Sequence, residues 1–295
     1  MTTTLRDTRA RIDWPVRGRF DLARSIAFGF GGRRVAPAGR RDTTMRLAFV
    51  LDGYAAHAGV AVTQPAPDLV RFEVVGDVDP ERAAAQAARV LSLDEDATGY
   101  DQMVDRDPML RVAYDARPGL RPPLFHSAYE AMIWAVLSAR RPVAQMGEVR
   151  ERLAVAHGRV LEVAGRQVAA LPTPEQLLAV DTFPGIPDVK LRRMHAIAAA
   201  AGDGRLDTEE LRMREVADVG AELQGFEGIG PFYAELVTVR ALGHTDVLPT
   251  TEPRVVAATA ARLGLESLSS ADFAEAAEAW RPWRTWACVA LRAAA

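Results

Sequence analysis

The chain has 295 residues, of which 49% are hydrophobic and 25% are charged, so it is long enough for a full core in one large or two ordinary domains. Its net charge of −3 excludes a protein that coats nucleic acid through bulk positive charge, so any contact with DNA has to be local and partly main-chain. The single cysteine, Cys288, excludes a disulfide within the chain, and the spacing of the five histidines predicts no zinc site.

Neither a signal peptide nor a membrane span is expected. Residues 2–11 are polar with no apolar core behind them, and no apolar run elsewhere reaches membrane-spanning length. We therefore expect a cytoplasmic protein that does not contact membranes, with residues 1–13 frayed.

The first third of the chain has the pattern of a small antiparallel sheet. Strand-like runs occupy residues 45–51, 59–63 and 69–75, and the third alternates apolar and charged side chains as a half-buried strand does. Asp79 and Pro80 then begin an alanine-rich helix that runs to about Leu91. Residues 1–105 are predicted to form this sheet domain.

From about residue 106 the pattern changes to helices joined by proline- and glycine-rich loops. Residues 127–139 place apolar side chains at helical spacing, and further helices are expected up to about His157 and over residues 188–201. Thr173 and Gln176 form a capping box around Pro174. We predict an all-helical domain over residues 106–295, and therefore an α+β fold for the whole chain.

A helix-hairpin-helix is predicted at residues 223–234. One helix ends near Leu223, three glycines follow within six residues, and a second helix begins at Pro231, whose missing N–H does no harm there. The amides of Gly228, Gly230 and the first helical turn then point outward and can bind an anion such as a phosphate. The alternative interpretation is an ordinary pair of helices with a glycine turn.

The loop that follows the second hairpin helix ends at another helix start. Thr250 or Thr251 can be its N-cap and Glu252 its first-turn acid, which by itself is an ordinary helix beginning. A carboxylate beside a DNA-binding hairpin can also stabilise the positive charge that develops on a sugar when its base departs. Such a reaction requires the base to leave the stack and enter a pocket.

Motifs spread along the whole chain carry a family resemblance. They are Asp13-Trp14 with Phe20, the string Ala-Arg-Pro-Gly-Leu-Arg at 116–121, Ala128-Tyr-Glu, Leu171-Pro-Thr-Pro, the hairpin at 223–230, Leu248-Pro249 and Trp280-Arg-Pro-Trp-Arg284. In order and spacing the chain resembles 3-methyladenine DNA glycosylase II, the AlkA type of the helix-hairpin-helix DNA glycosylase superfamily. The resemblance implies an N-terminal sheet domain like half of a TATA-binding protein, two helical subdomains with a cleft between them, and monofunctional excision of alkylated bases without a cofactor.

The resemblance also implies which residues contact DNA. Arg140 matches the residue that wedges into the duplex gap, with an exposed arginine at a helix end as the alternative interpretation. A sodium or potassium ion held by the carbonyls of Gln224, Phe226 and Ile229 is a further expectation, and no other metal is expected. The remaining predicted DNA-binding residues lie in the hairpin: Gly225, Phe226, Gly228, Gly230 and Tyr233.

The position of the family's catalytic aspartate is ambiguous in this chain. Counted from Leu248-Pro249 it falls on Thr251, and counted from Gly230 it falls on Glu252. Our hypothesis is that Glu252 takes the aspartate's role, with Thr251 beside it. The alternative is that Glu252 is only a first-turn acid and that catalysis is weak or lost.

The predicted base pocket is less aromatic than the family pattern. Phe20 matches a pocket aromatic, Phe232 replaces a tryptophan, Leu236 replaces a tyrosine, and Trp286 is a further candidate. A family tryptophan near the end of the last helix becomes Arg292. Because aromatic faces hold cationic bases, the preferred lesion is expected to differ from 3-methyladenine.

We predict a monomeric DNA glycosylase of base-excision repair that acts on double-stranded DNA with a damaged base, associated with the nucleoid in the cytoplasm. No lysine stands near residues 231–234, so no strand cleavage by a Schiff base is expected. The second hypothesis is a catalytically weak or inactive binder of DNA damage, and the third is an unrelated helical interaction protein.

Overall fold

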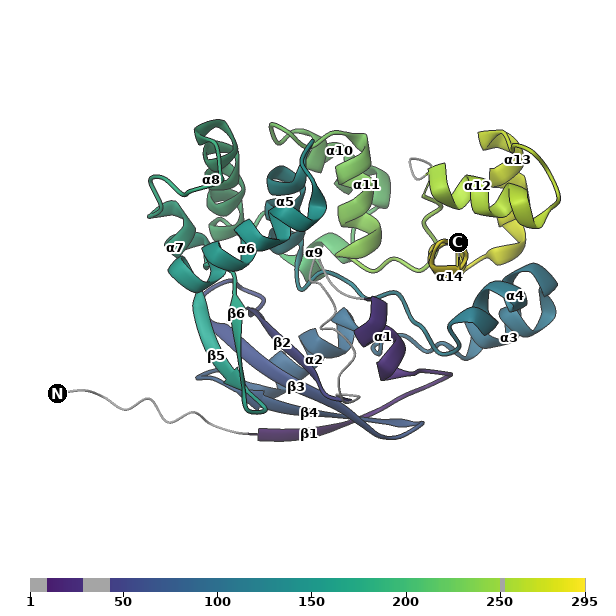
Figure 1. Ribbon diagram of the computed structural model, residues 1–295, viewed down its shortest axis with the longest axis horizontal. Coiled ribbons are helices and arrows are strands. Elements are labelled where there is room, and N and C mark those ends of the chain that lie inside the picture. The colour runs from purple at the N-terminus through teal and green to yellow at the C-terminus, as the bar shows by residue number, and fades with distance from the viewer. Residues whose placement is uncertain (1–9, 29–42, 250–252, 295) are drawn as a thin grey trace.

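A computed structural model describes residues 10–28, 43–249 and 253–294 of the chain. A small antiparallel sheet forms one layer, a group of helices lies above it, and a second group of helices lies beside both (Figure 1). The sheet has four strands in the order β1-β4-β3-β2. Their bounds are β1 (Ala10–Pro15), β2 (Met45–Val50), β3 (His57–Ala66) and β4 (Leu69–Val75).

Alternating side chains explain why these strands form a half-buried sheet. In the pairing of β3 with β4, Val60 lies opposite Val74 and Val62 opposite Phe72, and all four side chains are fully or almost fully buried. They pack against α2 (Pro80–Val90), whose start is capped by the Asp79 side chain accepting from two main-chain amides. The antiparallel sheet with a helix on it is therefore confirmed.

The strand β1 is a correction to the sequence analysis, which treated residues 1–13 as frayed. Residues 10–15 pair with residues 69–74 of β4, from Ala10 opposite Val74 to Pro15 opposite Leu69. The strand alternates half-buried and exposed residues, and its half-buried Ile12 and Trp14 pack against the core of the sheet. It pairs with the free edge of β4, and the alternation of Ile12 and Trp14 with Arg11 and Asp13 is the period of a half-buried strand that the sequence analysis did not use.

A second correction is the β-hairpin within the region expected to be all helical. Strands β5 (Arg159–Val163) and β6 (Arg166–Ala170) are joined by a two-residue turn in which Ala164 and Gly165 both have positive φ. The hairpin packs on the face of the sheet opposite α2. Gly59 permits the close approach, because a Cβ there would lie 2.7 Å from a methyl of Val163.

The remaining secondary-structure elements of the described chain are helices. Among them, α5 is buried along all of its 11 residues, where the sequence had predicted a single apolar face. The remaining elements are α1 (Leu22–Phe28), α3 (Thr98–Arg106), α4 (Pro108–Ala116), α5 (Ala128–Ser138), α6 (Val143–His157), α7 (Pro174–Leu178), α8 (Asp188–Gly202), α9 (Thr208–Arg212), α10 (Val216–Gln224), α11 (Pro231–Arg240), α12 (Pro253–Arg262), α13 (Ser270–Ala277), η1 (Glu278–Trp280) and α14 (Arg284–Ala294).

The buried side chains of the helices form two separate cores. One lies among α5, α6, α8, α10 and α11, and the other joins α3 and α4 to α12, α13 and α14. Tyr100 and Val104 thus share a core with Phe273 and Trp280, across the predicted boundary between residues 105 and 106. That boundary stays a prediction.

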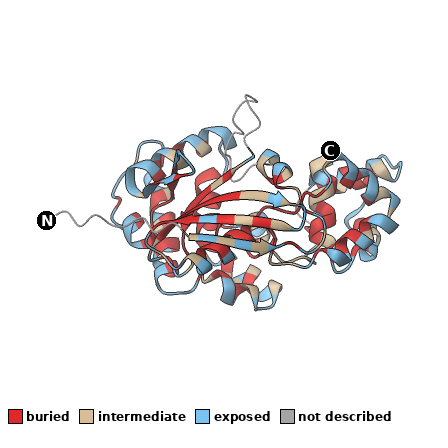
Figure 2. Ribbon diagram, turned by 90° about the horizontal axis from the view of Figure 1, so that it is seen from below, coloured by how far each residue is buried: buried red, intermediate tan, exposed pale blue. Residues whose placement is uncertain are grey.

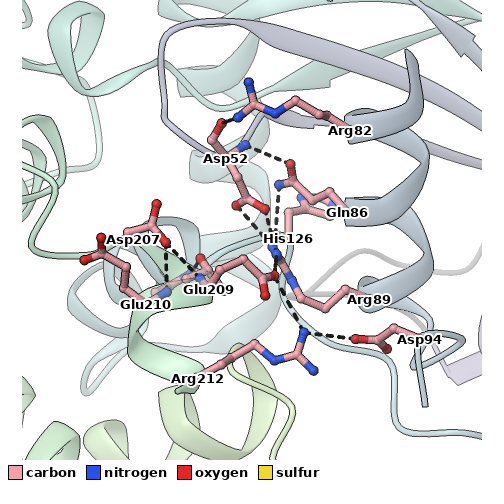
Figure 3. Close-up of polar contacts among 12 residues, drawn as sticks. Asp52, Arg82, Gln86, Arg89, Asp94, His126, Asp207, Glu209, Glu210 and Arg212 are labelled. Atoms are coloured by element: carbon pink, nitrogen blue, oxygen red, sulfur yellow. Dashed lines mark hydrogen bonds and ion pairs between the residues drawn. The ribbon is translucent and has the colours of Figure 1, made fainter. Parts of the chain in front are cut away.

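An ion-pair network ties the sheet layer to the helices above it. Arg89 of α2 is 3% exposed and donates to Asp52 after β2, at 2.6 Å, and to Glu209 of α9, at 2.5 Å (Figure 3). Arg212, one turn further along α9, donates to Asp94 at 2.9 Å. Side chains from both layers thus meet at α9.

Buried residues follow the strands and the inner helices, whereas the outer helices carry most of the exposed ones (Figure 2). None of the helices in the described ranges has both the length and the apolar character that crossing a membrane requires.

Candidate functional site

The predicted helix-hairpin-helix is formed by α10 and α11. Gly228 has φ +94°, a conformation that favours glycine, and Gly230 is the N-cap of α11 in extended conformation. Pro231 occupies the first helical position, as predicted. Ile229 is 4% exposed and packs into the core between the helices, while its N–H donates to the carbonyl of Phe226 at 3.0 Å.

The glycines of the turn face solvent. Gly225, Gly228 and Gly230 are all exposed, and no side chain caps the first turn of α11. The main-chain amides of that turn are therefore accessible to an anion. Phe226 and Tyr233 are partly buried against the core, so their contacts with DNA stay predictions, as do those of the glycines.

The monovalent ion expected at the hairpin would be held by main-chain carbonyl oxygens. The carbonyl of Phe226 already accepts a hydrogen bond from the N–H of Ile229. Acidic, histidine and cysteine side chains in the described residues form no cluster of three or more that could hold a metal. The ion at the hairpin carbonyls stays a prediction.

Glu227 forms an ion pair across the hairpin. Its carboxylate accepts from Arg193 of α8 at 2.6 Å, and this hydrogen bond lowers the pKa of the exposed Glu227 carboxyl. Arg193 lies against the turn, because a Cβ on Gly228 would be 3.1 Å from its Cδ. The negative charge at the hairpin is thus paired.

Arg140 lies at the end of α5, close to other basic side chains. It is exposed and has φ +57°, which is uncommon for a residue with a Cβ. The ammonium group of Lys190 donates to the carbonyls of Leu137 and Ala139, at 2.7 and 2.9 Å, and so closes the helix end just before Arg140. Burial lowers the pKa of Lys190, and the neighbouring charges of Arg141 and Arg193 lower it further.

A chain of contacts links the end of α5, just before Arg140, to the hairpin. Lys190 lies near both Arg141 and Arg193, and Arg193 pairs with the hairpin residue Glu227. Arg193 therefore lies beside the exposed Gly228, and Lys190 carries a second positive charge near Arg193. Positive charge next to accessible amides suits a phosphate backbone.

A cavity of about 120 Å³ lies between α11, α12 and α14. An engineered apolar cavity of about 150 Å³ holds benzene, so this volume suits an aromatic ring that enters from the open side. Of the four predicted pocket residues it brings together Phe232 and Leu236. The full lining is Phe232, Glu235, Leu236, Val239, Arg240, Pro249, Val255, Thr285, Cys288, Val289 and Arg292.

Phe20 and Trp286 are not among the described residues that line this cavity, and their place in the base pocket stays a prediction. Both rings lie 5.8 Å from the guanidinium carbon of Arg121, which is 1% exposed. Arg121 donates to main-chain carbonyls of Arg19 and Ser92. The two aromatic residues therefore pack around a buried arginine, the last residue of the motif at 116–121.

The sequence analysis missed Glu235, Arg240 and Cys288 as lining residues. Glu235 and Leu236 follow Phe232 by three and four positions, so helical spacing from Phe232 was a usable signal. Cys288 is buried beside them, and burial raises the pKa of its thiol to about 12. It is therefore a neutral wall residue.

The catalytic candidates Thr251 and Glu252 lie outside the described residues. Pro249 precedes that segment and Val255 follows it, and both line the cavity. The assignment of either residue as the acid stays a prediction.

The loop that leads to this segment is fixed by the start of α14. The Thr285 hydroxyl donates to the carbonyl of Val247 at 2.8 Å and accepts from its N–H at 2.9 Å. Asp246 accepts from Arg284 Nε and from Arg281 Nη1, each at 2.8 Å. We call these residues, Asp246, Val247, Arg281, Arg284 and Thr285, the loop clamp. The two arginines of the Arg-Pro-Trp-Arg motif thus hold the loop at Asp246.

The fold and the hairpin together match those of solved DNA glycosylase structures. A 3-methyladenine DNA glycosylase from Archaeoglobus fulgidus superimposes with a TM-score of 0.73 at 20% identity, over 96% of this chain and 97% of that protein. This likeness shows the fold.

Sequence comparison identifies the relatives of the chain. It is 31% identical, over 220 residues, to a probable bifunctional transcriptional activator/DNA repair enzyme AlkA of Mycobacterium tuberculosis. The aligned region covers 70% of this chain and 42% of that protein. It is 27% identical, over 162 residues, to a DNA-3-methyladenine glycosylase of Bacillus subtilis, covering 53% of each. The predicted resemblance to 3-methyladenine DNA glycosylases is confirmed. The chain spans about two fifths to one half of the length of these relatives, and no family model matches it.

Proposed function

We propose that this chain is a monofunctional DNA glycosylase that excises alkylated or otherwise damaged bases from double-stranded DNA in base-excision repair. One observation carries the proposal: the exposed hairpin amides and a ring-sized cavity share the helix α11. Phe232, in the first turn of that helix, is 46% exposed and lines the cavity. A strand held at Gly228 and Gly230 can deliver an extruded base to Phe232 on the same helix.

The mechanism assigns the stabilising charge to Glu252. Departure of the base leaves positive charge on the sugar, and a carboxylate beside it lowers the barrier and orients the attacking water. The described residues Pro249 and Val255, on either side of Glu252 in the sequence, line the cavity and support this assignment. Arg140 fills the gap that the base leaves.

The test is chromatography of the bases released from methylated duplex DNA. We expect Glu252→Gln to release them about 10²- to 10³-fold more slowly than the parent protein, the usual effect of removing one charge-stabilising group. Equal rates for the two proteins would show that the Glu252 assignment is wrong. Strand cleavage by the pure protein without added lyase would contradict the monofunctional mechanism.

The alternative is a non-catalytic binder of DNA damage, favoured by the low aromatic content of the cavity wall and by the uncharged Thr251. It differs in one observable: tight binding to abasic or distorted duplex with no base released. We further propose a monomer that acts in the cytoplasm on the nucleoid.

A further inference from the structure

The turn between α5 and α6 holds Arg140 in a backbone conformation that usually requires glycine. The N–H of Arg141 donates to the carbonyl of Ser138 at 3.1 Å, Ala139 has φ −53° and ψ 121°, and Arg140 has φ +57°. These are the features of a type II β-turn, whose third residue is usually glycine or asparagine. We call residues 138–141 the wedge turn. A residue with a Cβ in this strained position points to a function for its side chain.

The side chain of Arg140 is presented to solvent from a rigid base. It is exposed, and in the part of the chain that the structure describes no hydrogen bond or ion pair occupies its guanidinium. The turn begins at the end of α5, whose 11 residues are all buried. A cation with unused donors at this place can fill a gap in a base stack and contact the phosphates beside it.

Lys190 reaches this turn from another helix. It is the only lysine among the 295 residues, and it lies in the first turn of α8, where the helix dipole disfavours a positive charge. Its ammonium group lies instead at the carbonyl end of α5, where it donates to Leu137 and Ala139 at 2.7 and 2.9 Å. The contact with α5 therefore explains this lysine, whereas the local sequence of α8 does not.

The carbonyl of Ala139 is the group that distinguishes this turn from the commoner type I turn. It belongs to the central peptide of the wedge turn, between Ala139 and Arg140. A type I turn has ψ of about −30° at its second residue, which points this carbonyl to the opposite face of the turn and gives the third residue a negative φ. By accepting from Lys190, the carbonyl is held on the type II side.

Resting on the proposed function, we propose that Lys190 is the positioning residue of the wedge turn: its ammonium group fixes the peptide between Ala139 and Arg140, so that Arg140 is aimed at the gap in the duplex before DNA binds. Without this contact the turn relaxes towards the type I form, and the Arg140 side chain leaves the turn in another direction. In this role Lys190 acts through Arg140.

The experiment measures by fluorescence anisotropy the affinity for a duplex with one tetrahydrofuran abasic-site analogue, relative to the intact duplex. Because only the first duplex has a gap, this ratio separates the wedge from contacts with the phosphate backbone. Arg140→Ala should lower the ratio on the order of tenfold, the contribution of one charged hydrogen-bonding group. Lys190→Met, which removes the donors but nearly keeps the length of the side chain, should lower it several-fold.

A double-mutant cycle distinguishes positioning from an independent role of the lysine. If Lys190 acts by presenting Arg140, Lys190→Met should leave the ratio unchanged in a protein that already carries Arg140→Ala. Equal effects of Lys190→Met in the two backgrounds would overturn the inference, as would an unchanged ratio in the single variant Lys190→Met.

Two matched variants control for charge and for the donors. Arg192→Met removes a positive charge from an exposed position of the same helix and should weaken binding to both duplexes alike. If it lowered the ratio as much as Lys190→Met, the charge of α8 would be the cause and the inference would be wrong. Lys190→Arg keeps the charge and the donors and should recover most of the ratio, and a ratio as low as that of Lys190→Met would count against the hydrogen bonds.

Circular dichroism checks that each variant is folded. If Lys190→Met does not fold, Lys190→Gln replaces it in the cycle with the same expected results, because its shorter, neutral side chain cannot serve both carbonyls.

Failure of the proposed function has a different signature. If no base is released from methylated duplex but the affinity ratios follow the expected order, the glycosylase activity is refuted and the positioning role of Lys190 stands. If bases are released and the ratio is unchanged in Lys190→Met, the glycosylase stands and this role is refuted.

Discussion

The negative charge of Glu227 lies in a turn whose exposed amides suit phosphate. Its carboxylate is held by Arg193, with 74% of the Glu227 side chain exposed, so the ion pair contributes little to stability. Its larger effect is electrostatic. Arg193 is one of the basic side chains beside the hairpin, and pairing with Glu227 offsets its attraction for the backbone of DNA.

Removing this charge should strengthen binding to DNA. We expect Glu227→Gln to bind undamaged duplex several-fold more tightly, with a salt dependence steeper by about one unit in log K against log salt, because Arg193 becomes available to a phosphate. Fluorescence anisotropy at several salt concentrations measures both quantities. The free energy of unfolding should change by less than about 0.5 kcal/mol.

The control is Glu73→Gln, which makes the same change in net charge at an exposed position of β4 in the sheet. If this control tightened binding as much as Glu227→Gln, the effect would come from net charge, and the local role of the hairpin pair would be excluded.

At the scale of elements, the approach to the candidate catalytic segment is set by the loop clamp. Thr285 is 2% exposed and satisfies both main-chain groups of Val247 through one hydroxyl. The main-chain amide of Thr285 also donates to the carbonyl of Thr245 at 2.9 Å. Because α14 lines the cavity as well, one helix positions both the pocket wall and the loop that enters it.

Breaking this clamp should lower catalysis more than binding. In Thr285→Val the side chain keeps its shape but leaves the N–H and carbonyl of Val247 without their partner, at a cost of about 1–3 kcal/mol in stability. We expect at least a tenfold slower release of bases, because misplacing a reacting group by about 1 Å can cost on the order of 10²-fold. Single-turnover rates and affinity for abasic duplex separate the two effects.

Thr285→Ser retains the hydroxyl and should recover most of the parent rate. Loss of activity in the serine variant, or full activity in the valine variant, would show that the hydroxyl does not position the loop.

Across the whole molecule, buried polar groups join layers that are distant in sequence. Glu130 of α5 is 1% exposed and contacts Nδ1 of His126 and the guanidinium of Arg150, both at 2.9 Å, and the N–H of Val50 at 3.2 Å. The sheet, α5 and α6 therefore meet at one carboxylate. Arg89 plays the same part between α2 and α9 (Figure 3).

The Glu130 carboxylate should make stability depend on acid pH. Burial alone would raise its pKa, but His126, Arg150 and the Val50 amide outweigh burial and lower it to about 2. A carboxyl whose pKa is lower in the folded state stabilises the protein above its unfolded pKa, near 4.5, and that contribution is lost as the pH falls towards 2. The shift corresponds to about 3 kcal/mol.

Glu130→Gln tests this contribution. At pH 7 the variant should unfold in urea with a free energy about 3–5 kcal/mol below the parent, because Arg150 loses its buried partner. The difference between the two proteins should shrink between pH 4.5 and 2. A difference that stays constant over that range would assign the loss to packing and exclude the charge.

Local chemistry in the sequence determined the hairpin and most helix ends. Gly228 needs positive φ, Pro231 begins a helix, and Thr173 forms its capping box with Gln176, because each of these features depends on residues a few positions apart. The likeness to 3-methyladenine DNA glycosylases could be recognised from the motifs for the same reason: they are short and their order is preserved.

Contacts between distant residues decided the rest. The strand β1 pairs with an edge that β4 supplies, the hairpin β5–β6 packs where Gly59 leaves room, and Arg121 brings Phe20 and Trp286 to one buried guanidinium. The charges on the cavity wall come from α11 and α14, which are far apart in the chain. The sequence by itself determined the local elements and the likeness to known glycosylases, whereas only the tertiary structure decided which side chains face the pocket, because packing among distant elements controls that choice.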